Sequence, residues 1–152
     1  MTETVDFTEE LIRCGVPQEF HDEFRAMGLG TLIPKLNIIF EELTAERAVA
    51  TMPVAGNTQA VGFLHGGATA ALIETLGSFA ANVAAGSQRV AVGSEISVSH
   101  LRPGLQGRVR AVCTAYKIGR TQCVHHIEVR DEQDRLISVG RMTNSFISRP
   151  QS

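Results

Sequence analysis

The segment from Gln59 to Gly67 holds the first candidates for chemistry in this sequence. It reads Gln-Ala-Val-Gly-Phe-Leu-His-Gly-Gly, and glycines at a helix start are costly unless the backbone must approach another group closely. A helix N-terminus offers unpaired N–H groups and a partial positive charge. The Gly66 N–H could therefore donate to a carbonyl oxygen that becomes negative in a transition state, with His65 orienting the loop. The alternative is a glycine-rich helix start with a packed histidine.

A single carboxylate, Glu74, is the second candidate. It lies in the nearly apolar stretch 70–78, where a buried carboxylate without partners would be costly. Ser78 follows four residues later on the same helical face and could hydrogen-bond to it. Asn82 extends that face by four more residues, which fits a pocket wall or a subunit contact. The alternative is that Glu74 falls on an exposed stripe of the helix.

The spacing of Gly66 and Glu74 has a consequence for assembly. The two are eight residues apart, so they are separated by about 12 Å along one helix axis. They cannot both reach one small carbonyl group from the same chain. A two-fold dimer with antiparallel helices would place Gly66 of one subunit beside Glu74 of the other. The residues therefore predict a homodimer with two shared sites.

The elements that must position these residues follow from hydrophobic periodicity. One helix of about five turns is predicted over 66–85, with Gly86 as its stop. Two shorter helices are predicted over 8–14 and 17–27. Strands are predicted over 35–43 and 47–54. From Arg89 onward a period of two predicts four consecutive strands in an antiparallel meander, the first ending near Arg102 and the others covering 108–117, 122–130 and 136–147.

These elements define an α+β fold. A single apolar helix needs a sheet to bury it, and a curved antiparallel sheet can wrap around one helix. We expect a helical N-terminal lead-in over 1–30 and a main domain over 31–152.

Composition limits the function classes. The chain has 152 residues, 43% of them hydrophobic and 20% charged, with a net charge of −2, which indicates one globular domain without the basic face of a nucleic-acid-binding protein. Three cysteines without a CxxC pair favour a reducing compartment. The acidic N-terminus is not a signal peptide, and the stretch 66–86 is too often interrupted for a membrane span. We expect a cytoplasmic protein, with no metal-ligand spacing among its His, Cys and Asp residues.

The candidate residues together resemble a known family. The pattern Gln59-x-x-Gly62-x-x-His65-Gly66-Gly67, followed by Glu74, is similar to that of the hotdog-fold acyl-CoA thioesterases. The branch it resembles includes the Arthrobacter-type 4-hydroxybenzoyl-CoA thioesterase, the bacterial dihydroxynaphthoyl-CoA and aryl-carrier-protein thioesterases, and the phenylacetate-pathway thioesterases. The resemblance covers residues 35–148 and includes the segments 99–103 and 119–121.

This resemblance implies a role for each candidate. Glu74 would be the catalytic carboxylate, as nucleophile or as general base for water. The Gly66 N–H would polarise the thioester carbonyl, supported by His65, and Gln59 would bind near the thioester or orient water. The remaining residues that it implies are substrate contacts at Phe63, Gly67, Ser78 and Asn82, and contacts to the CoA phosphates at Arg102, Arg120, Thr121 and Arg149. No cofactor is implied, because CoA is part of the substrate and water is the co-substrate.

The resemblance favours hydrolysis of a small, aromatic acyl-CoA by a homodimer, assembled further into a homotetramer. Alternatives are a medium-chain acyl-CoA or acyl-carrier-protein thioesterase, a hotdog dehydratase or hydratase, and a non-catalytic domain that binds acyl-CoA. The sequence contains no hydratase motif. A non-catalytic binding domain would be expected to lose Glu74 or the His65-Gly66-Gly67 segment, and both are present.

Overall fold

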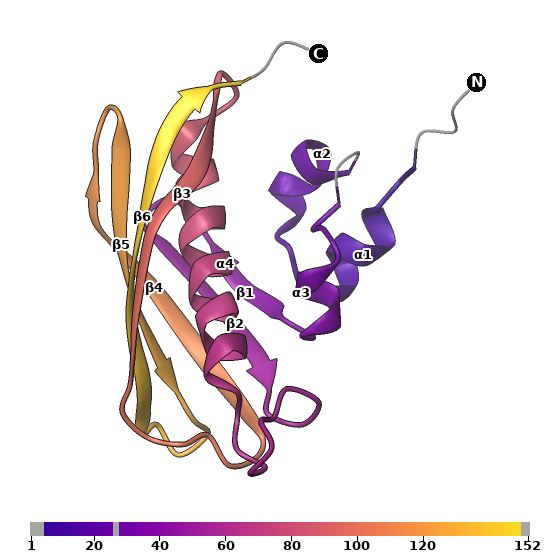
Figure 1. The fold of residues 1–152 in the computed structure, drawn as a ribbon. Coiled ribbons are helices and arrows are strands. Elements are labelled where there is room, and N and C mark those ends of the chain that lie inside the picture. The colour runs from indigo at the N-terminus through magenta and orange to yellow at the C-terminus, as the bar shows by residue number, and fades with distance from the viewer. Residues whose placement is uncertain (1–4, 26–27, 150–152) are drawn as a thin grey trace.

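The computed structural model describes residues 5–25 and 28–149. A helical N-terminal segment leads into a six-stranded sheet and one long helix (Figure 1). In chain order the elements are α1 (Thr8–Arg13), η1 (Gln18–Phe20), α2 (His21–Phe24), α3 (Leu32–Lys35), β1 (Ile39–Leu43), β2 (Arg47–Pro53), α4 (Gly66–Ala85), β3 (Arg89–His100), β4 (Arg108–Ile118), β5 (Gln122–Arg130) and β6 (Leu136–Ser148). The predicted α+β fold, with a central helix and a curved antiparallel sheet, is confirmed.

Helix α4 has the predicted bounds. The His65 side chain caps its N-terminus by accepting a hydrogen bond from the Gly67 N–H. At its other end Gly86 has a φ of +67° and a ψ of −169°, a backbone conformation that glycine adopts readily and other residues rarely do, and the helix ends there. Figure 1 shows α4 along one face of the sheet, with the lead-in helices gathered beside it.

The order of the strands corrects one prediction. The sheet order is β1-β2-β4-β5-β6-β3, so only β4, β5 and β6 form a meander, and β3 pairs with β6 instead of β4. Strand β4 alternates buried and exposed residues as a central strand does, whereas β3 is exposed from Val92 to Ser97. A strand with so little buried surface is suited to an edge, and a period of two cannot show which strands pair.

Two predicted elements at the N-terminal end are also different. The strand predicted from Lys35 begins at Ile39, because 32–35 form α3 and Asn37 turns the chain with a φ of +51°. The helix predicted over 17–27 is divided into η1 and α2 and ends at Phe24. Met27, the last residue predicted for it, lies outside the described residues.

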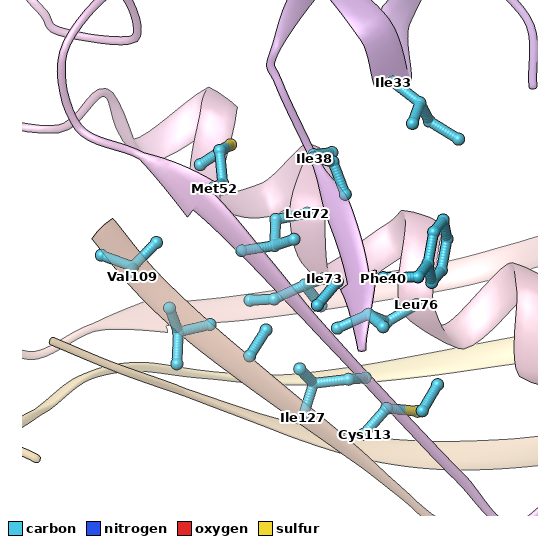
Figure 2. Close-up of a cluster of buried hydrophobic side chains, with 14 of the residues drawn as sticks. Ile33, Ile38, Phe40, Met52, Leu72, Ile73, Leu76, Val109, Cys113 and Ile127 are labelled. Carbon is cyan, nitrogen blue, oxygen red and sulfur yellow. The ribbon is translucent and has the colours of Figure 1, made fainter. Parts of the chain in front are cut away.

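The core lies between α4 and the concave face of the sheet. Leu72, Ile73 and Leu76 are fully buried and point toward Val109, Cys113 and Ile127 of the sheet (Figure 2). Burying each such side chain stabilises the fold by about 1.5–3 kcal/mol. Helix α4 is long and apolar enough to cross a membrane by length and composition alone. Its packing against the sheet accounts for that apolar surface.

The lead-in shares this core. Leu11 and Phe24 belong to the same buried cluster, and the rings of Phe24 and Phe40 lie 5.2 and 5.0 Å from that of Phe79 on α4. The Phe40 N–H donates to the Cys14 carbonyl at 2.7 Å. The lead-in therefore covers the outer face of α4 and also occupies part of the edge of β1.

Candidate active site

The loop before α4 is held in a compact turn. The Gln59 N–H donates to the Phe63 carbonyl and the Gly62 N–H donates to the Gln59 carbonyl, each at 2.8 Å. Gly62 has a φ of +84°, which glycine adopts without strain. The loop thus delivers His65 and Gly66 to the start of α4 in a fixed orientation.

The Gly66 N–H is available for a ligand. The His65 ring accepts from the Gly67 N–H at 2.8 Å, and the His65 carbonyl accepts from the Thr69 N–H. The Gly66 N–H donates to no acceptor within the part of the chain that the structure describes. His65 is therefore a capping residue that orders the helix start, and it leaves the adjacent N–H unused.

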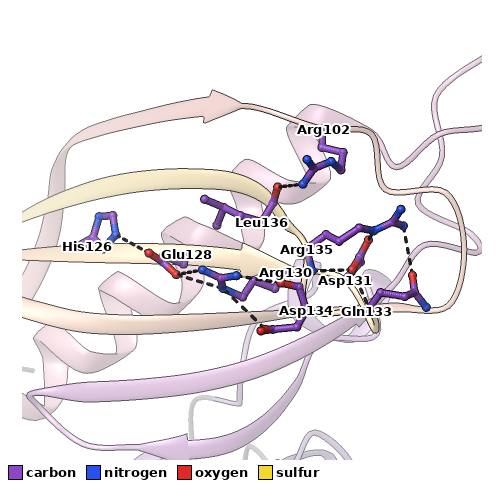
Figure 3. Close-up of polar contacts among 9 residues, drawn as sticks. All are labelled: Arg102, His126, Glu128, Arg130, Asp131, Gln133, Asp134, Arg135 and Leu136. Carbon is purple, nitrogen blue, oxygen red and sulfur yellow. Dashed lines mark hydrogen bonds and ion pairs between the residues drawn. The ribbon is translucent and has the colours of Figure 1, made fainter.

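A cavity of about 330 Å³ opens beside this N–H. Four of the predicted residues, Gln59, Phe63, Gly66 and Arg102, line it, whereas His65 and Gly67 lie next to it in the chain. Arg102 donates to the Leu136 carbonyl at 3.1 Å, which anchors its exposed guanidinium group at the edge of the sheet (Figure 3). The structure thus brings together a free backbone donor, an amide and a cation.

Three polar residues of this cavity, Thr69, His100 and Ser138, are absent from the sequence-based set. His100 and Ser138 line it together, and the His100 Nδ1 lies 3.0 Å from the Ser138 Oγ. The two are directly paired in the β3–β6 register. The predicted meander placed β3 beside β4, so this pair could not be found from the sequence. The only signal was that His100 falls in the segment 99–103.

Glu74 lies elsewhere on α4. Its side chain is exposed in the single chain. The buried position considered for Glu74 from the sequence is therefore not observed, and the alternative of an exposed helical stripe is. The Glu74 Oε1 lies 4.0 Å from the point where a Cβ would stand on Gly93 of β3. Among the described residues no hydrogen bond links Glu74 to Ser78, which is half-buried. The carboxylate therefore faces outward over the edge strand β3, away from the cavity beside Gly66.

Asn82 uses its side chain within the fold. Its Nδ2 donates to the Ser78 carbonyl at 2.9 Å, and its Oδ1 accepts from the Ala91 N–H at 3.0 Å. It thereby ties the second half of α4 to the start of β3. A second cavity of about 330 Å³ adjoins it, between α4 and the lead-in.

The other predicted CoA contacts lie at the far end of α4. Arg149 faces Glu23 at 3.6 Å and lines the cavity beside Asn82. The Arg120 carbonyl accepts from Arg89, which also donates to the Ala85 carbonyl at the end of α4, and the Thr121 carbonyl accepts from the Phe146 N–H. Within one chain, these three residues are therefore separated from Arg102 by about the length of α4, which is about 28 Å.

The buried cysteines and His125 are structural. Burial raises the pKa of the Cys113 thiol to about 12 and that of the Cys123 thiol to about 11, so neither is a nucleophile at neutral pH. His125 is fully buried, and one of its ring nitrogens bonds the Ala45 carbonyl at 2.9 Å. Over the residues 5–25 and 28–149, no three His, Cys, Asp or Glu side chains are placed to hold a metal ion.

Comparisons with known proteins agree with this fold. Residues 61–138 match the family model of the thioesterase superfamily. The 1,4-dihydroxy-2-naphthoyl-CoA hydrolase of Escherichia coli is 38% identical over 127 residues, which cover 83% of this chain and 93% of the hydrolase. A mutant thioesterase of Pseudomonas aeruginosa is 31% identical with a TM-score of 0.79, covering 90% of this chain and 99% of that chain.

A thioesterase of Staphylococcus aureus is a third relative. The structure of its glutamine-to-alanine mutant is 28% identical to this chain, with a TM-score of 0.72, and covers 76% of this chain and 97% of that chain. A glutamate-to-alanine mutant of the same protein has a TM-score of 0.73. The shared fold, the family match and the unused N–H at the start of α4 lead to one conclusion: this chain belongs to the thioesterase superfamily and is a thioester hydrolase with the hotdog fold.

Proposed function

We propose that this thioesterase hydrolyses a small aromatic acyl-CoA, of the hydroxybenzoyl, phenylacetyl or naphthoyl type, to the free acid and CoA. The observation that carries the proposal is the cavity of about 330 Å³ in which the Gly66 backbone, Gln59 and Arg102 meet. The exposed ring of Phe63 gives this cavity an aromatic wall. The hydrolase of Escherichia coli, which is named for a naphthoyl-CoA substrate, supports an aromatic acyl group.

The Gly66 N–H supplies the electrostatic part of the reaction. It stands at the positive end of a 20-residue helix, where a developing negative charge is stabilised. The thioester carbonyl oxygen accepts this hydrogen bond and becomes more negative as the carbonyl carbon is attacked. One such donor contributes roughly 10²- to 10³-fold to kcat in related chemistry.

Glu74 supplies the carboxylate. As a nucleophile it attacks the carbonyl carbon, the C–S bond breaks with its electrons going to sulfur, and water hydrolyses the resulting anhydride. As a general base it takes a proton from water, which attacks the carbonyl directly. In the Staphylococcus aureus thioesterase, the mutated glutamine and glutamate are fifteen positions apart. Gln59 and Glu74 have the same separation, which supports their assignment to the site.

A homodimer joins the two halves of the site. Glu74 and Gly66 of one chain are about 12 Å apart along α4, and Glu74 lies over β3, whose outer edge has no strand partner among the described residues. A second copy that pairs with this edge in an antiparallel manner brings the partner's Glu74 toward Gly66. Within a single chain Glu74 is exposed to solvent. In the proposed dimer it instead faces the site of the other subunit.

The same symmetry unites the proposed CoA contacts. With antiparallel helices, the far end of the partner's α4 lies near the start of the first α4. The partner's Arg149, Arg120 and Thr121 then approach the cavity that contains Arg102, and together they bind the phosphates of CoA, as Arg side chains do. The proposal also places three residues at the border of the acyl group: Ser78, Asn82 and Gly67. It further includes the assembly of two dimers into a tetramer and a cytoplasmic location for the protein.

Thioester hydrolysis by wild type and Glu74→Gln tests the proposal. The substrates are benzoyl-, phenylacetyl-, naphthoyl- and straight-chain acyl-CoAs, and released thiol is trapped with a chromogenic disulfide. We expect aromatic esters to turn over fastest and Glu74→Gln to lose several orders of magnitude in kcat. Preference for a straight-chain ester would contradict the aromatic assignment. Undiminished turnover by Glu74→Gln would contradict its catalytic role, and binding without turnover by wild type would indicate a non-catalytic domain.

A further inference from the structure

His100 packs directly against Gly66. A Cβ built on Gly66 would lie 2.9 Å from the His100 Nε2 and 3.3 Å from its Cε1. A Cβ is about 2.5 Å from its own backbone nitrogen. The His100 Nε2 and the Gly66 nitrogen are therefore no more than about 5.4 Å apart. Both line the same cavity, so one oxygen atom, at a usual distance of about 2.7–3.1 Å from each donor, can contact both nitrogens.

Ser138 decides which nitrogen of His100 carries the proton. The Ser138 side chain is buried at 2% exposure, and its only partner among the described residues is the His100 Nδ1 at 3.0 Å. If Nδ1–H donated to Ser138, the buried hydroxyl hydrogen would have no acceptor, which is unfavourable. The hydroxyl therefore donates to Nδ1. This tautomer leaves the proton on Nε2, which is the nitrogen beside Gly66.

Among the described residues, the ionisable side chains that line this cavity are His100 and Arg102. His100 packs on Gly66, whereas the Arg102 guanidinium is bonded to the Leu136 carbonyl at the edge of the sheet. The neighbouring ring of His65 is turned to the Gly67 N–H. Within the described chain, His100 is thus the imidazole whose free N–H adjoins the unused backbone donor.

We infer that His100 is a catalytic residue, donating a second hydrogen bond from Nε2–H to the thioester carbonyl oxygen beside that of the Gly66 N–H, and that Ser138 is its positioning residue. The inference rests on the proposed function. No bond forms or breaks at His100. Its N–H stabilises the oxyanion while the carbonyl carbon is attacked and until the C–S electrons leave with sulfur. Two donors also fix the direction of the carbonyl group.

Three variants separate this role from simple packing. His100→Phe keeps a ring against Gly66 but removes the donor, and we expect kcat to fall roughly 10²- to 10³-fold with a small change in KM. His100→Gln places an amide N–H near the position of Nε2, so it should recover part of the loss. Ser138→Ala frees the other tautomer, so it should lower kcat less than His100→Phe does. Arg102→Ala is the control from the same cavity and should act on KM.

The deciding measurement is the carbonyl stretch of a bound analogue. The probe is phenylacetyl-CoA with CH₂ in place of sulfur and a ¹³C-labelled carbonyl, observed by isotope-edited infrared spectroscopy. We expect the stretch to move to higher frequency in His100→Phe, by an intermediate amount in Ser138→Ala, and not at all in Arg102→Ala. An unchanged stretch in His100→Phe overturns the inference. It would leave the proposed function intact, because that depends on Glu74 and on turnover by wild type.

Discussion

Met142 occupies the space where a side chain on Gly77 would begin. The Met142 Cβ and Cγ atoms lie 2.7 Å from the Cβ position built on Gly77. The same methionine extends to Gly93, whose Cβ position is 2.6 Å from the Met142 Cε. Helix α4 therefore approaches strands β3 and β6 closely one turn after Glu74, and this contact sets the height of the helix above the sheet.

Gly77→Ala should destabilise the protein through this contact. The added methyl group must displace Met142, and overpacking of this kind typically costs about 1–3 kcal/mol, although alanine is the better helix former. Urea unfolding of the variant measures the change. The double variant Gly77→Ala with Met142→Gly, which removes both the Cβ and the Cγ of residue 142, should lose less than the sum of the two single losses. Additive losses would show that the two residues are not coupled.

Gly66→Pro should abolish turnover by removing one N–H. Proline is tolerated at the first position of a helix. His65 already has the extended conformation that precedes proline, with a φ of −68° and a ψ of 130°. Gly66→Ala is the matched control, because its Cβ meets His100 in the same way but the N–H remains. We expect kcat of the proline variant to be roughly 10²- to 10³-fold below that of the alanine variant. Equal rates would exclude the N–H from catalysis.

Two inactive variants should complement each other if the sites are shared. A mixed dimer of Glu74→Gln and Gly66→Pro chains has one site in which both groups are intact. Random pairing after co-expression should restore about one quarter of wild-type activity, measured as thiol release per protomer. Each variant expressed alone is the control. Activity no higher than that of the separate variants would place both residues of each site in one chain.

Arg102→Ala should raise KM with little change in kcat. The guanidinium group lines the cavity and is bonded to the Leu136 carbonyl, and a charged contact to phosphate weakens as salt increases. The wild-type KM for CoA esters should therefore rise with ionic strength, and that of Arg102→Ala should rise less steeply. Arg110→Ala is the control, because Arg110 is paired with Glu41. A large fall in kcat would contradict a binding role.

His125 should make the protein sensitive to acid. Burial lowers the pKa of the His125 imidazole, and its Nδ1 has no partner among the described residues. Between this lowered pKa and the unfolded value of about 6.5, the unfolded chain binds the proton and the folded chain does not. Stability is therefore retained above the unfolded value and falls as the pH decreases through this window.

The measurement for His125 is urea unfolding between pH 7.5 and 5. His125→Gln keeps a donor for the Ala45 carbonyl, and its stability should depend less on pH than that of wild type, by up to about 1.4 kcal/mol per pH unit for one proton. His126→Gln is the control on the opposite, partly exposed face of the same strand. Parallel pH profiles for wild type and His125→Gln would exclude this histidine as the cause.

The central helix could be predicted from the sequence because its information is local. Apolar periodicity and the flanking residues His65 and Gly86 define α4, and the bounds predicted from them are correct. The strand order depends on contacts distant in sequence. The seven-residue connection after His100 carries the chain across the end of the sheet, and nothing in the alternation of β3 indicates that its neighbour is β6.

In the candidate site, too, residues close in sequence could be predicted and residues distant in sequence could not. Gln59, Phe63 and Gly66 are close in sequence and meet in one cavity with Arg102. His100 and Ser138 are brought together only by the register of β3 and β6, so they were missed. The sequence left open whether Glu74 is buried or on an exposed stripe, and the structure shows that it is exposed, because an apolar pattern does not specify which residues of the helix the sheet covers.

The hydrogen bond from Phe40 to Cys14 has a consequence for how far the sheet can grow. It occupies part of the edge of β1, a five-residue strand with a bulge, and such features discourage further strands from adding. Among the described residues, the outer edge of β3 is then the edge of the sheet without a partner. In the proposed dimer two copies join along β3, so both ends of the combined sheet are covered and no further copy can add by strand pairing. Deleting the first fifteen residues would unblock the opposite end and favour filaments.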